Sequence, residues 1–146
     1  MGLSEIYTSG KQRQNRGHFA NIVKIAKADQ KITPEEESLL YQTAKNLNLS
    51  LTSFQRIVEN PEKFPINPPG NSEERITRLY SLSKMILADG EVATEEIKLL
   101  QKITIGLGFS TKNIEKVCEN AIGLVAQNTD LDTFIVEIKK INRSKE

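Results

Sequence analysis

Two short acidic stretches contain the residues whose types and spacing are best suited to chemistry. The first reads ADQKITPEE over residues 28–36, and the second reads ADGEVATEE over residues 88–96. Hard cations bind through several oxygen ligands, and the two stretches brought together could supply four carboxylates. We therefore predict a divalent-cation site for calcium or magnesium with these ligands: Asp29, Glu36, Asp89 and Glu96. The other acids would widen an acidic binding face: Glu35, Glu91 and Glu95.

The same residues also have a structural explanation, which the sequence leaves open. Thr33, Pro34 and Glu36 occupy the cap, first and third positions of a helix start, the pattern of a capping box. The second stretch has Ala93 at the cap position, so Thr94 could shift that helix start by one residue. An independent EF-hand loop is not expected, because apolar residues replace its first two acidic ligands: Met85 and Leu87.

The remaining composition excludes most other chemistry. The chain has 20 Lys+Arg against 19 Asp+Glu, for a formal net charge of +1. A single cysteine and a single histidine exclude an internal disulfide, a zinc finger and most histidine-based catalysis. Cys118 lies in an apolar stripe and His18 is interpreted as an ordinary helix-start residue, so we expect no enzyme. The basic clusters near both ends lack interleaved aromatic residues, and we expect no nucleic-acid partner.

A 60-residue internal repeat defines the elements that position the acidic stretches. Residues 18–60 align with residues 78–120, and 11 of the 43 aligned pairs are identical. Apolar residues recur at helical spacing throughout, with no alternating strand pattern. Each copy is therefore predicted to form a helix, an acidic loop, a helix, a short turn and a helix. Ile32 and Val92 are expected to anchor the two loops in the core.

Cap and turn residues set the other boundaries. Asn and Gly tolerate the left-handed conformation that ends a helix. They occur where the second helix of each copy is expected to end, as Asn46 and Asn48 in repeat one and as Gly106 and Gly108 in repeat two. Ser50 and Ser110 can cap the third helices. Residues 61–72 contain four prolines and predict an extended connector, with Phe64 and Ile66 holding it to the core.

The predicted fold is all-α, a compact bundle of about seven helices built from two pseudo-symmetric three-helix repeats. We expect one domain over residues 1–146, with these parts: repeat one at about 18–60, the connector at 61–72, repeat two at about 76–120 and a C-terminal helix at about 131–142. No apolar run approaches the length of a transmembrane helix, and the first residues lack the features of a signal peptide. The expected compartment is the cytoplasm.

The duplicated Ala-Asp-Gly-x-[Ile/Val]-x-x-x-Glu pattern resembles the TerB-like tellurite-resistance family, whose domain also occurs in membrane-anchored DnaJ-like co-chaperones. The likeness covers about residues 16–142. The first copy departs from the pattern, with Gln30 and Lys31 in place of Gly90 and Glu91. The resemblance implies a helical bundle and a role in tellurite resistance and stress responses. It also implies metal sensing beside a TerC-type integral-membrane protein, and thus a peripheral location at the inner membrane through that partner.

Two functional classes therefore remain open from the sequence. One is a non-enzymatic stress-response protein whose duplicated acidic face binds or senses a divalent cation. The other is a protein-interaction module whose acidic face docks a basic or membrane-associated partner.

Overall fold

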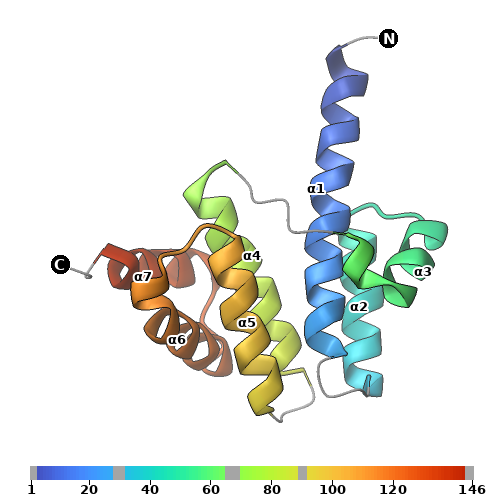
Figure 1. The fold of residues 1–146 in the computed structure, drawn as a ribbon. Helices are drawn as coiled ribbons and strands as arrows, with labels where there is room; N and C mark the ends of the chain where they lie inside the picture. The colour runs from blue at the N-terminus through green and yellow to red at the C-terminus, as the bar shows by residue number, and fades with distance from the viewer. Residues whose placement is uncertain (1–2, 28–31, 65–69, 89–91, 144–146) are drawn as a thin grey trace.

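The computed structural model describes residues 3–27, 32–64, 70–88 and 92–143. This part of the chain forms seven α-helices, two short 3-10 helices and no strands (Figure 1). In chain order the elements are α1 (Leu3–Ala26), α2 (Pro34–Asn46), α3 (Leu51–Glu59), η1 (Pro61–Lys63), α4 (Ser72–Ile86), α5 (Thr94–Gly106), η2 (Thr111–Asn113), α6 (Ile114–Ala126) and α7 (Leu131–Arg143). The predicted all-α bundle of about seven helices is confirmed.

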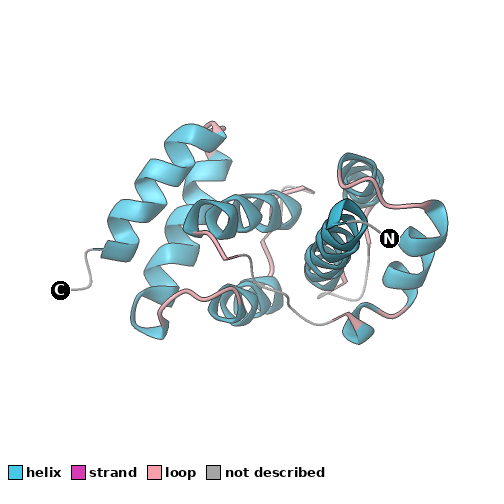
Figure 2. Ribbon diagram, turned by 90° about the horizontal axis from the view of Figure 1, so that it is seen from above, coloured by secondary structure: helices cyan, strands magenta, loops and turns pink. Residues whose placement is uncertain are grey.

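The bundle is organised around the contact between α1 and α4, the opening helices of the two repeats. Helices α2 and α3 and the η1 turn pack on α1, whereas α5, α6 and α7 surround α4 (Figure 2). Helix α1 also packs on α5, which joins the repeats further. Both helices contribute fully buried side chains to the core: Phe19, Ile22, Ile25, Leu79, Leu82 and Met85.

Several predicted boundaries are confirmed by backbone geometry. Asn48 has φ 58° and Gly108 has φ 108°, so both second helices end in a left-handed residue at the same repeat position. The Ser50 hydroxyl accepts a hydrogen bond from the Ser53 amide at the start of α3. Helix α7 follows Asp130, whose carboxylate accepts a 2.8 Å hydrogen bond from the Thr133 amide.

Five local predictions were wrong. Ser110 caps the η2 turn, whereas α6 begins later, at Ile114, without a side-chain cap. Helix α1 begins at Leu3, so His18 lies inside the helix and is only 6% exposed instead of standing at a helix start. The connector is not extended from its first residue, because Pro61 opens the η1 turn. Helix α5 is not shifted by Thr94, because the Glu96 side chain fixes its start at Ala93. Val92 is 45% exposed and does not anchor its loop, although Ile32 does pack on the core.

The two repeats differ in how tightly their outer helices pack. Helices α5 and α6 pack closely, whereas their counterparts α2 and α3 lie farther apart. Likewise α1 packs on α5, but the equivalent pairing of α4 with α2 is looser. The departure from symmetry leaves open space on both sides of α2.

Candidate functional site

The acidic stretches cap helices wherever the structure describes them. In the first copy the Thr33 amide donates to Glu36 Oε1 at 2.9 Å, and the Glu36 amide donates to Thr33 Oγ1 at 3.1 Å. This is the predicted capping box. In the second copy the Ala93 amide donates to Glu96 Oε1 at 3.0 Å, while Ala93 has no hydroxyl to return the bond. Both carboxylates are buried.

The predicted cation ligands are only partly placed by the structure. Asp29, Asp89 and Glu91 lie outside the described residues. Glu35 and Glu95 are exposed beside the buried capping carboxylates, at helix starts that lie at the same end of the bundle (Figure 1). Within the described ranges no three His, Cys, Asp or Glu side chains form a group that could hold a metal ion. The cation site stays a prediction.

The two nucleophile candidates are both inside the core. Cys118 is buried, with its Sγ 3.7 Å from Thr104 Oγ1, and burial raises the pKa of its thiol to about 11. Because the thiolate is the reactive form of cysteine, this environment suits an inert structural residue. Burial, and to a smaller extent the Arg78 charge, lower the pKa of His18 to about 3. His18 is therefore neutral at pH 7.

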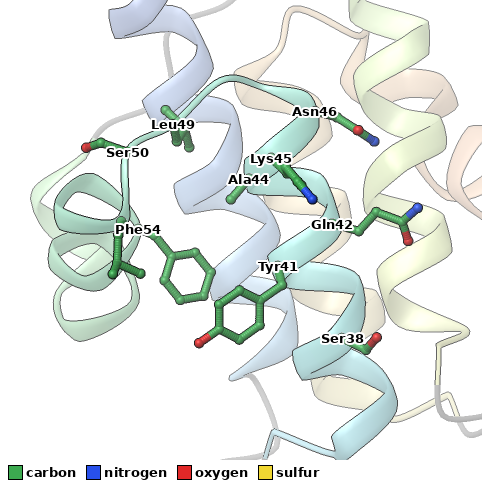
Figure 3. A pocket seen from close by; sticks show the side chains of 10 residues that line it. Ser38, Tyr41, Gln42, Ala44, Lys45, Asn46, Leu49, Ser50 and Phe54 are labelled. Atoms are coloured by element: carbon green, nitrogen blue, oxygen red, sulfur yellow. The ribbon is translucent and has the colours of Figure 1, made fainter.

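A groove between α2 and α3, which we call the aromatic groove, opens to the surface. It has a volume of about 650 Å³. The Tyr41 and Phe54 rings stack across it with centroids 4.6 Å apart and planes inclined by 18° (Figure 3). Tyr41 is 55% exposed and Leu51 is 62% exposed. The groove therefore presents large apolar side chains to solvent.

The second repeat shows why this groove is open. Its equivalents of Tyr41 and Phe54 are Gln101 and Ile114, so no aromatic pair stands between α5 and α6. There Thr104 and Cys118 contact each other directly across the two helices. Local periodicity did not identify the groove, because most of the apolar positions are shared by the two copies. The usable signal was the exchange of Tyr41 and Leu51 for polar residues at the equivalent positions of repeat two.

Comparisons with known proteins add nothing to this geometry. No family model, curated protein or solved structure matches the chain. None of the described helices is both long enough and apolar enough to cross a membrane. The aromatic groove and the capping carboxylates are therefore the features that bear on function.

Proposed function

We propose that this chain is a non-enzymatic protein-interaction module whose aromatic groove receives an amphipathic helix from a partner protein. The observation that carries the proposal is the exposed, stacked Tyr41–Phe54 pair in a groove that the equivalent helices of repeat two close. Tyrosine is enriched among the residues that dominate binding energy at interfaces, and helix-in-groove docking is a common mode of recognition.

Charged residues on the face of α2 that carries Tyr41 define the partner's chemistry. Lys45 lines the groove, and Glu37 lies one turn before Tyr41. Glu37, Tyr41 and Lys45 follow one another at four-residue spacing along α2, and all three are exposed. They span nine residues, or about 12 Å of helix rise, which matches two to three turns of a docked helix. A fitting partner therefore carries an apolar stripe with a basic residue toward Glu37 and an acidic residue toward Lys45.

The resemblance to the TerB-like family supplies a cellular setting for this module. Within the proposal, the docked helix belongs to a component of a stress response, and a TerC-type membrane protein is a candidate partner. Cation binding at Asp29, Glu36, Asp89 and Glu96 is a separate prediction. It does not carry the interaction proposal, because the two described ligands already cap helices.

A peptide selection tests the interaction proposal. Displayed libraries of amphipathic helical peptides are selected on the wild-type protein, and the affinity of the winners is measured by fluorescence anisotropy. We expect Tyr41→Ser to weaken their binding by about tenfold or more, since a truncated interface anchor typically costs above 1 kcal/mol. Val136→Ser on α7 is the matched control, because Val136 is 51% exposed and lies on another helix.

Two outcomes would overturn the proposal. One is a selection that yields no helix bound above background. The other is winners whose affinity falls equally in Tyr41→Ser and Val136→Ser. Light scattering of the free protein provides the remaining check, since a concentration-dependent dimer abolished by Tyr41→Ser would assign the groove to a second copy instead.

Thermal melting tests the cation prediction on its own. If calcium or magnesium binds the folded chain, its melting temperature rises with ion concentration. We expect that rise to disappear in the Asp89→Asn, Glu96→Gln double variant. An equal response of wild type and variant, or no response at all, contradicts a cation site at these residues.

A further inference from the structure

A second opening, which we call the polar cavity, lies on the opposite side of α2 from the aromatic groove. It has a volume of about 340 Å³, within the range of small-molecule sites in proteins. Gln42 and Asn46 point from α2 toward α4, away from α3 (Figure 3), and both line the cavity. The space exists because α4 and α2 pack less closely than their repeat counterparts, α1 and α5.

Polar groups converge on this cavity from three helices. Helix α1 contributes His18, and the other hydrogen-bonding groups come from α2 and α4: Gln42, Thr43, Asn46, Thr77, Ser81 and Lys84. Tyr80 forms part of the same wall, with its hydroxyl donating to the Thr129 carbonyl at 3.1 Å. A cavity lined by this many donors and acceptors favours a polar occupant over an apolar one.

His18 is the observation that points to a ligand. Its side chain is more than nine-tenths buried, and its Nδ1 has no hydrogen-bond partner among the described residues. Buried polar atoms in folded proteins are nearly always hydrogen-bonded, and leaving one without a partner is costly. The His18 ring lines the cavity. Because Nδ1 itself has almost no accessible surface, a molecule in the cavity can supply its missing partner only if the ring turns toward it.

The charges around the cavity indicate which charge a ligand should carry. Lys84 lines the wall, with its Nζ 4.6 Å from the centre of the Tyr80 ring. Arg78 is also buried on α4 and its charge helps to lower the pKa of His18, but it does not line the cavity. None of the described residues that line the cavity is an Asp or Glu. Lys84 is the one charged side chain among the described residues that line the cavity, so the cavity favours an anionic oxygen group over a cation.

We propose that the polar cavity binds a small oxyanion compound, a carboxylate or a phosphate. Lys84 pairs with its charge, His18 hydrogen-bonds to it, and Gln42 and Asn46 hold its remaining polar atoms. Because α2 separates this cavity from the aromatic groove, and Gln42 and Asn46 border both, the bound compound contacts the helix that is proposed to dock a partner. The cavity proposal does not depend on that docking.

The single histidine of the chain allows a direct test. His18 is the only histidine, so the imidazole signals in long-range proton–nitrogen NMR spectra of the uniformly labelled protein all come from its ring. Sodium phosphate and sodium succinate are titrated in separate arms at pH 7, with sodium chloride holding the ionic strength constant. We expect a saturable shift of the His18 ring signals with at least one of the two anions, and the responding arm identifies the oxyanion class.

Two lysine variants make the test specific. Lys84→Gln should raise the dissociation constant about tenfold or more, because it removes a charge-assisted hydrogen bond to the anion. Lys102→Gln, which removes the same charge from the exposed face of α5, should leave the constant unchanged. The proposal is overturned if neither anion produces a saturable shift. It is also overturned if Lys84→Gln binds like the wild type, or if both variants weaken binding equally.

Discussion

At the scale of single residues, the two matching glutamates illustrate how a duplicated acidic pattern can have a structural cause. Glu36 and Glu96 occupy equivalent repeat positions, are equally buried, and accept a hydrogen bond from the backbone amide three residues earlier. Each carboxylate thus satisfies an amide that the first turn of the helix leaves without an intrahelical partner. Capping alone is sufficient to explain an acid at both positions.

Replacing a capping carboxylate should therefore cost stability in the absence of any metal. We expect Glu36→Ala to lower the free energy of unfolding by about 1–3 kcal/mol, since it leaves the buried Thr33 amide without its acceptor. The neighbouring exposed Glu35→Ala should change it by less than about 0.5 kcal/mol. Urea unfolding in a buffer containing a chelator measures both. Equal effects of the two substitutions would contradict the capping role.

The buried His18 makes a second residue-level prediction, on pH dependence. Its pKa is lowered from 6.5 to about 3 in the folded chain, chiefly by burial. Between these values the unfolded chain binds a proton that the folded chain does not, so the free energy of unfolding falls as pH falls. We expect this contribution to reach at most about 1.4 kcal/mol per pH unit below pH 6.5.

A variant without the imidazole isolates that contribution. The stability of His18→Gln, measured by urea unfolding at several values between pH 7 and pH 4, should decline less steeply than that of the wild type. The carboxylates titrate in both proteins, so their effect cancels in the difference. Curves that stay parallel over this range would show that His18 accepts its proton without cost in the folded state.

At the scale of elements, replacing glycine by alanine should change the free energy of unfolding in opposite directions at two sites. One site follows the end of α5 and the other lies inside α6. Gly108 has φ 108°, and a Cβ built there would lie 3.1 Å from Arg75 Nη1. Gly123 lies within α6 and has no heavy atom within 4 Å of its added Cβ. Gly108→Ala should therefore destabilise the protein by about 1–2 kcal/mol, since left-handed backbone disfavours a Cβ. Gly123→Ala should stabilise it by about 0.5–1 kcal/mol. Thermal and urea unfolding of both variants decide the signs.

The elements that sequence reasoning predicted well are those with a local chemical signal. The Thr33–Glu36 capping box, the left-handed Asn48 and Gly108, and the Asp130 start of α7 all depend on residues within one turn of each other. The early start of α1 was missed because residues 3–17 contain two glycines and little apolar periodicity. That part of the helix gives no strong local signal.

The candidate site was harder to predict because it depends on spacing between helices. Equal apolar positions in the two copies suggested equal packing, yet α5 and α6 close together while α2 and α3 stay apart. The difference arises from side chains such as Tyr41 and Phe54, which occupy the space between the helices. Likewise, the aligned repeat begins at His18, so the sequence suggested a helix start there. In the structure His18 lies inside α1 and is buried by tertiary packing.

At the scale of the whole molecule, α1 couples the two repeats into one core. It contacts α2, α3 and η1 of the first repeat and α4 and α5 of the second. Helix α7 covers α4 and α6, with Phe134 fully buried and its ring 4.9 Å from that of Tyr80. Because α1 and α4 pack on each other, unfolding of either repeat would expose core residues of the other. We therefore expect the described bundle to unfold as a single cooperative unit.

Thiol labelling tests this cooperativity directly. Cys118 is the only cysteine and is buried in repeat two, so its reaction with a thiol reagent reports opening of that repeat. Ala44→Cys in a Cys118→Ala background places the same probe at a buried position of repeat one. Each labelling midpoint is compared with the circular-dichroism midpoint of the same protein in urea, which corrects for stability changes caused by the substitutions. The two midpoints should coincide in each protein, because a probe that depends on global unfolding reports the global free energy. Labelling of either repeat at a lower urea concentration than the loss of helix would show that it opens independently and that α1 does not bind the repeats into one unit.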